Sequence, residues 1–270
     1  MKRIKPKLNN YITKAWKVFN KMEMRVLPGN VAFFFVLALI PIITITLIIA
    51  SSFSISFNSV IEFVQDVFPE EASRMILEII SGKGFDGNVG TFNIIAFFVA
   101  SNGTYAIINA SNTLYNIKDS DPLRERVKSV VLLMILILLI TFLIIVPVLG
   151  ETLLNLIKNN LVIERIKTIY YIIKWPVTFF MIFTILKFIY TIAPSKKIAS
   201  KTTTYGALFT TFFWTIATAI FSYYLKFFAN YNVIYGNISS IIILMIWVYI
   251  ISYVFVMGIA INAVNLKDEK

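Results

Sequence analysis

The chain has 270 residues, of which 58% are hydrophobic and 14% charged, whereas a soluble domain is roughly 45–50% apolar and about 25% charged. Several apolar runs reach the roughly 20 residues that a helix needs to cross a bilayer. This composition predicts a polytopic membrane protein and excludes an ordinary soluble domain. The sequence has no Cys and no His, which excludes disulfides, thiol nucleophiles and imidazole chemistry. We expect no catalytic residue, no metal and no cofactor.

The first segment, residues 1–29, holds eight of the 25 Lys and Arg residues. Its apolar residues follow a spacing of three and four: Leu8, Ile12, Ala15, Phe19, Met22 and Val26. The pattern predicts an amphipathic cytoplasmic arm that lies on the membrane and binds anionic headgroups. Nucleic acid is not an expected partner, because basic flanks are usual beside membrane spans.

Six apolar segments follow the arm. The predicted membrane helices are about 31–53, 91–113, 129–149, 168–192, 203–227 and 238–264. The predicted fold class is therefore all-α: one six-helix membrane domain over residues 30–265, with a cytoplasmic tail over 266–270. The acidic connection 54–90 is expected to form two short extracellular helices, about 59–68 and 70–81, split by Pro69.

The orientation follows from the positive charges of the connections. One side of a six-helix topology receives 17 Lys and Arg residues and the other side five. Because cytoplasmic loops carry the excess of positive charge, both termini are predicted to be cytoplasmic and the acidic connection to lie outside.

The second predicted membrane helix is unusually polar. Its polar residues recur at spacings of 3, 4, 3 and 4: Asn102, Tyr105, Asn109, Asn112 and Asn116. They share one helical face. Because such groups are costly in hydrocarbon, we expect the face to look at other helices or at a wet cavity. Two interpretations stay open: contacts that hold helices together, or the wall of a substrate path.

Other polar residues are weaker candidates. Asn30 in the first helix and Thr211, Thr215 and Thr218 in the fifth extend the predicted path. Threonine hydroxyls often bond back to their own helix, which favours a structural role for these three. The link before the sixth helix contains candidates for an outer gate or a tight turn: Tyr231, Asn232, Tyr235 and Gly236.

Several segments together carry a family resemblance. They are LPGNVAFF at 27–34 running to Pro41, NASNTLY at 109–115, Gly206-Ala207 with Trp214, FSYYLKFFANYNVIYGN at 221–237, and Trp247 with Gly258 and Asn262-Ala263. Over about residues 15–265 the chain resembles the YihY/BrkB family of bacterial inner-membrane proteins. The resemblance implies six membrane helices in a bacterial cell membrane, and a virulence-factor label. A ribonuclease label in that family is generally regarded as a misassignment.

Two functions fit these features. The first is a transporter or flippase of lipid or another amphiphilic envelope component, because the predicted membrane interior is rich in neutral polar groups and almost without ionisable ones. The alternative is a non-transporting scaffold or envelope assembly or regulatory factor. An enzyme is not expected: a ribonuclease usually needs clustered carboxylates or histidine, and six of the 14 acids here lie in the outer connection.

Overall fold

A computed structural model describes residues 22–52, 61, 64–65, 69–70, 73–74, 77, 89–118, 121–156, 160–228 and 238–268. The gate candidates Tyr231, Asn232, Tyr235 and Gly236 lie outside the described residues, as does most of the predicted amphipathic arm. Within the acidic connection, the described positions on both sides of Pro69 are helical.

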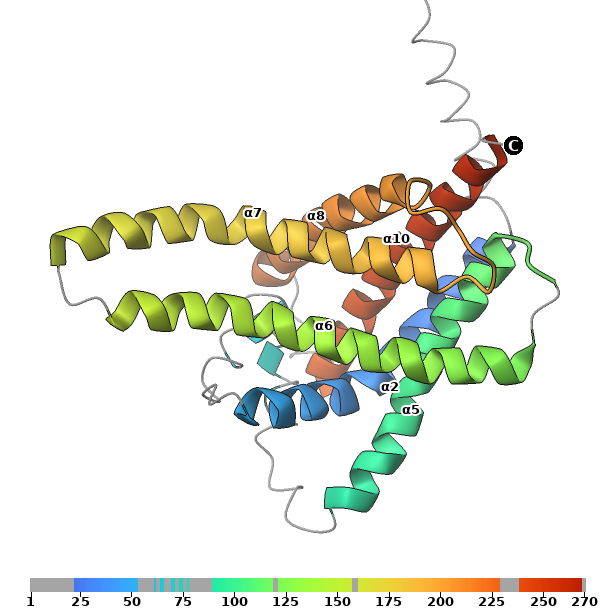
Figure 1. Cartoon of the computed structure of the whole chain (residues 1–270), viewed down its shortest axis with the longest axis horizontal. Helices are drawn as coiled ribbons and strands as arrows, with labels where there is room; N and C mark the ends of the chain where they lie inside the picture. The colour runs from blue at the N-terminus through green and yellow to red at the C-terminus, as the bar shows by residue number, and fades with distance from the viewer. Residues whose placement is uncertain are drawn as a thin grey trace, which may run out of the picture.

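Six long helices make up the described chain (Figure 1). They are α2 (Glu23–Ser52), α5 (Val89–Leu114), α6 (Pro122–Leu156), α7 (Asn160–Ile192), α8 (Thr204–Phe228) and α10 (Ser239–Asp268). Each contains one predicted membrane segment, so the all-α prediction is confirmed for these residues. Two of them, over Thr204–Phe227 and Ser239–Val264, are long and apolar enough to cross a membrane within the described part of the chain.

The helices α2, α6 and α7 begin earlier than the apolar runs suggest. At the start of α6, the Asp121 carboxylate accepts a hydrogen bond from the Leu123 backbone N–H at 3.0 Å, and Pro122 occupies the first helical position. Both features favour a helix start. Arg124, Arg126 and Lys128, which precede the third predicted membrane segment, therefore lie on the first turns of α6.

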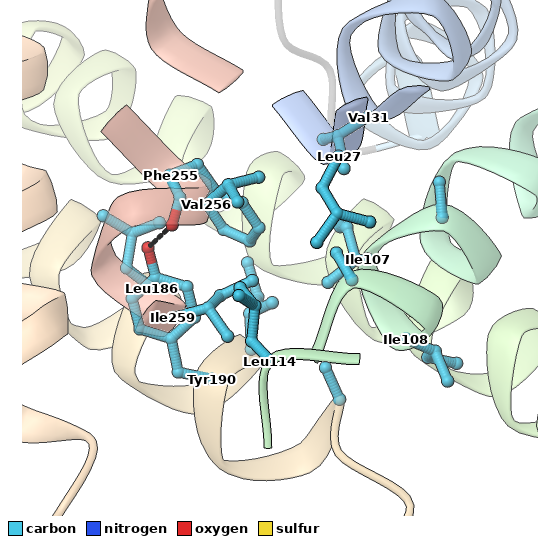
Figure 2. Packing of buried hydrophobic residues seen from close by; sticks show 14 of the residues in the cluster. Leu27, Val31, Ile107, Ile108, Leu114, Leu186, Tyr190, Phe255, Val256 and Ile259 are labelled. Atoms are coloured by element: carbon cyan, nitrogen blue, oxygen red, sulfur yellow. Dashed lines mark hydrogen bonds between the residues drawn. The ribbon is translucent and has the colours of Figure 1, made fainter. Parts of the chain in front are cut away.

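The packing order brings distant segments together. α2 packs against both α5 and α10, α8 packs on α10, and α6 and α7 run side by side along the long axis (Figure 1). The main buried cluster joins α2, α5, α7 and α10, with Val31, Ile107, Tyr190 and Phe255 among its members (Figure 2).

The outer surface of the helices is apolar. Large exposed hydrophobic side chains include Val131, Met134 and Leu138 on α6, Ile172 and Phe180 on α7, and Leu208, Phe212 and Ile220 on α8. A soluble monomer rarely exposes so many, since contiguous apolar patches favour association with a partner or a membrane. The pattern is that of helices that contact lipid.

Candidate functional site

The polar face of α5 divides between two environments. Asn112 is buried, with 5% of its surface exposed, whereas Asn102 and Tyr105 are half-buried and Asn109 and Asn116 are exposed. Of the five residues expected to face other helices or a wet cavity, Asn112 packs against another helix and Asn109 is exposed. Figure 1 shows α6 crossing α5, and Asn112 bonds to Glu125 near the start of α6.

The uncovered edge forms a row that we name the α5 stripe. It consists of Asn102, Tyr105, Asn109 and Thr113, each exposed or half-buried. Their spacing of three and four residues places them in one line along the helix. Thr113 is a member that sequence reasoning missed, although its position four residues after Asn109 would have indicated it.

Asn112 belongs to a buried hydrogen-bond network. Its amide donates to the Glu125 carboxylate, and to Ser195 Oγ at 2.8 Å. The Ser195 backbone N–H donates to Asn112 Oδ1 at 2.8 Å, and Ser195 Oγ donates to Glu125 Oε1 at 3.1 Å. We call these three residues the Asn112 junction. It ties α5 to α6 and to the link between α7 and α8, so Asn112 serves helix–helix contact.

Asn102 contacts a cation. Arg126 Nη1 donates to Asn102 Oδ1 at 2.7 Å, and two residues further along α5 the Thr104 hydroxyl donates to the Ser129 carbonyl at 2.7 Å. Two ionisable side chains thus contact the polar face, which sequence reasoning did not anticipate. Glu125 and Arg126 both reach it, because α6 already begins at Pro122.

A second basic side chain fixes the start of α6 against the α7–α8 link. Lys128 Nζ donates to the Pro194 carbonyl at 2.5 Å. Burial lowers the pKa of Lys128, and the neighbouring Arg124 lowers it further. This lysine therefore stabilises the same corner as the Asn112 junction.

Asn116 ends α5. Its φ of 56° is left-handed, the Asn116 N–H donates to the Thr113 carbonyl at 3.1 Å, and the Ile117 N–H donates to the Asn112 carbonyl at 2.8 Å. These are the two bonds of a Schellman motif, in which Asn is a common substitute for Gly. The backbone conformation accounts for Asn116 without a role in a path.

Two of the three candidate threonines of α8 bond to their own helix, and the third contacts α10. Thr211 and Thr215 donate to the carbonyls four residues earlier, at 2.8 and 3.0 Å. Thr218 accepts a hydrogen bond from Trp247 Nε1 at 3.3 Å, which joins α8 to α10. Asn30 is half-buried on α2. None of these contacts brings the four residues to the α5 stripe.

The residues that carry the family resemblance near the C-terminus meet in one place, which we call the glycine junction: Gly206, Gly258 and Asn262. The Gly206 N–H donates to Asn262 Oδ1 at 2.7 Å. A Cβ on Gly206 would lie 2.2 Å from the Gly258 carbonyl oxygen, a distance that no real Cβ adopts. The two glycines therefore permit close contact between α8 and α10.

Tyr190 of α7 closes the glycine junction from the other side. Its hydroxyl donates to the Phe255 carbonyl at 2.8 Å (Figure 2) and lies 2.7 Å from Thr210 Oγ1. A Cβ on Gly258 would lie 2.4 Å from the Tyr190 hydroxyl. Three helices thus meet around a closely packed polar centre, in which Asn262 Oδ1 is bonded and the buried Asn262 Nδ2 has no hydrogen-bond partner.

Comparison with known proteins agrees with this architecture. The chain matches the family described as virulence factor BrkB over residues 15–269. YfkH of Bacillus subtilis, which bears a ribonuclease-like name, is 29% identical over 247 residues that cover 90% of each chain. The UPF0761 membrane protein NTHI0384 of Haemophilus influenzae is 25% identical over 264 residues that cover 93% of each chain.

No solved structure matches. The similarity to membrane proteins extends over nearly the whole chain, and the described helices expose an apolar surface. The protein is therefore an integral membrane protein of a bacterial membrane, and the chain belongs to the virulence factor BrkB family.

Proposed function

We propose that the protein moves a lipid or another amphiphilic envelope component across the membrane along the α5 stripe. The observation that carries this proposal is the exposed row itself. Asn109 and Thr113 are exposed on a molecule whose other exposed helix faces present large apolar side chains. A headgroup would slide over amides and hydroxyls while its acyl chains stay in the lipid.

The energetics favour an occupied stripe. A neutral amide or hydroxyl that faces hydrocarbon without a hydrogen-bond partner costs roughly 2–7 kcal/mol, depending on the reference state. The stripe would therefore attract water or polar headgroups. An open row suits an amphiphile, because the tails need not enter the protein.

The proposed topology has six membrane crossings with both termini in the cytoplasm. Residues 114–128 with their four positive charges then lie at the cytoplasmic side. The α5 stripe would then lie near the cytoplasmic side, where Arg126 of this segment bonds to Asn102 and Glu125 bonds to Asn112. In this arrangement the basic arm over residues 1–29 would bind anionic headgroups on the same side, and nucleic acid remains an unexpected partner.

A second candidate is a non-transporting scaffold or assembly factor. It is favoured by the fact that Asn102 and Asn112 both hold α5 to α6. A partner helix would then cover the α5 stripe. Purification of a stoichiometric partner, together with a reconstituted protein that transports nothing, would favour the scaffold. A ribonuclease is not proposed, because the sequence has no His and six of its 14 acids lie in the outer connection.

The test is movement of fluorescent phospholipid between the leaflets of liposomes that contain the purified protein. The variant Tyr105→Leu/Asn109→Leu/Thr113→Val makes three of the four stripe residues apolar and leaves Asn102 and the Asn112 junction unchanged. We expect its transport rate to fall at least about tenfold, since a lost headgroup interaction of about 1.4 kcal/mol already gives that factor. Its unfolding should be unchanged.

The matched control removes exposed hydroxyls elsewhere. Thr184 donates to the Phe180 carbonyl at 2.8 Å and Thr215 to the Thr211 carbonyl, and both are exposed. Thr184→Val/Thr215→Val should transport lipid at the wild-type rate. Equal rates for the stripe variant and this control would exclude the stripe as the path.

A further inference from the structure

We propose that Arg126 and Asn102 form a binding site for the phosphate of an anionic membrane lipid at the Asn102 end of the α5 stripe. The inference rests on the proposed function, since it names the headgroup class for which the same row of side chains is suited. It concerns a different place from the basic arm, whose described part begins only at Met22.

The first argument is the charge of Arg126. Its guanidinium bonds to a neutral amide, and among the residues that the structure describes no carboxylate lies within 4.0 Å of it. The neighbouring Glu125 is engaged with Asn112 and Ser195. Asn102 and Asn112 are ten residues apart, which is about 15 Å along a helix. The adjacent charges Glu125 and Arg126 therefore contact two separate parts of the polar face, at Asn112 and at Asn102.

The second argument is hydrogen-bonding capacity. A guanidinium has five N–H donors in a planar fork that matches the oxygens of a phosphate. The bond from Nη1 to Asn102 uses one of them and fixes the direction of the fork. Arg126 is half-buried, so part of it stays open to a ligand beside Asn102. An anionic headgroup would supply the acceptors and the compensating charge.

The third argument is the apolar rim. Phe98, one turn before Asn102 on α5, is 56% exposed, and Leu123 and Val127 on either side of Arg126 are 74% and 60% exposed. The guanidinium of Arg126 would bind the phosphate of a lipid, and the exposed apolar side chains nearby in the sequence would contact its acyl chains. A free phosphate ion would leave these side chains without a partner.

The test measures binding apart from transport. Purified full-length protein in neutral detergent is titrated into tail-labelled phosphatidylglycerol and, as the reference, phosphatidylcholine with the same tails, and fluorescence anisotropy reports the affinity. We expect wild type to prefer phosphatidylglycerol. Arg126→Gln, which can still donate to Asn102, should lower that preference about tenfold, the effect of losing one charge-assisted bond. Arg126→Lys should restore most of it.

The control is Arg124→Gln, which removes an exposed charge two residues away on another side of α6. The basic arm would itself attract anionic lipid. The decisive quantity is therefore the difference between Arg126→Gln and Arg124→Gln in their preference for phosphatidylglycerol over phosphatidylcholine. An equal preference in Arg126→Gln and Arg124→Gln, or no preference in wild type, overturns the proposal. Displacement by inorganic phosphate beyond that by sodium chloride of equal ionic strength would indicate a free-phosphate site and also overturn it.

The two proposals fail separately. If the preference depends on Arg126 but liposomes show no lipid movement, the site stands and the proposed transport fails. If lipid moves at the same rate and without preference in wild type and Arg126→Gln, transport stands and the headgroup site is wrong.

Discussion

The α5 stripe and the glycine junction use the same kinds of side chain in opposite ways. In the glycine junction, Tyr190, Thr210 and Asn262 are buried, and their bonds run to neighbouring helices. In the stripe, Asn109 and Thr113 are exposed. Polar groups that are enclosed and paired stabilise a membrane fold, whereas polar groups left open on an apolar surface are available to a ligand. Burial and pairing, and not residue type, separate the two roles.

The largest change in the free energy of unfolding is expected when a side chain is added at the close contact of the glycine junction. Gly206→Ala would place a methyl group against the Gly258 carbonyl, and backbone cannot move aside cheaply. We expect the free energy of unfolding to fall by about 3 kcal/mol, at the upper end for an overpacked core. SDS titration of the purified protein measures it. The control Gly29→Ala should be tolerated, because its Cβ would meet Tyr249 at an ordinary 3.9 Å.

The next effect compares two asparagines three residues apart. Asn112→Leu removes the amide that binds Glu125 and Ser195 and leaves a buried carboxylate with fewer donors. We expect it to lower the free energy of unfolding by about 2 kcal/mol. Asn109→Leu should change it by less than about 0.5 kcal/mol, because Asn109 is exposed. If both variants unfold alike, the division of the polar face is wrong.

The smallest effect concerns Tyr190. Tyr190→Phe removes the hydroxyl that binds Phe255 and Thr210 but keeps the ring in the core. The expected loss of stability is about 1 kcal/mol, with lipid transport unchanged. Tyr205→Phe serves as the control, because Tyr205 is 66% exposed. If Tyr190→Phe kept full stability but changed the transport rate, Tyr190 would have a functional role and not the structural role expected here.

The sequence by itself determined the approximate positions of the six helices and the membrane location of the protein. Apolar runs of about 20 residues can only be buried in lipid or in a large core, so six helices followed, and their centres agree with the structure. The spacing of the amides on α5 also showed one polar face, and the back-bonding of Thr211 and Thr215 was predictable because it depends only on residues one turn away.

Only the tertiary structure decided which polar residues of α5 hold helices together and which are exposed. Asn109 and Asn112 are alike in sequence, and the crossing of α6 over α5 buries one and leaves the other exposed. The charges of Glu125 and Arg126 reach the polar face because a capped helix start at Pro122 carries them there. Contacts between residues far apart in the chain depend on how helices pack, and local spacing contains no information about that.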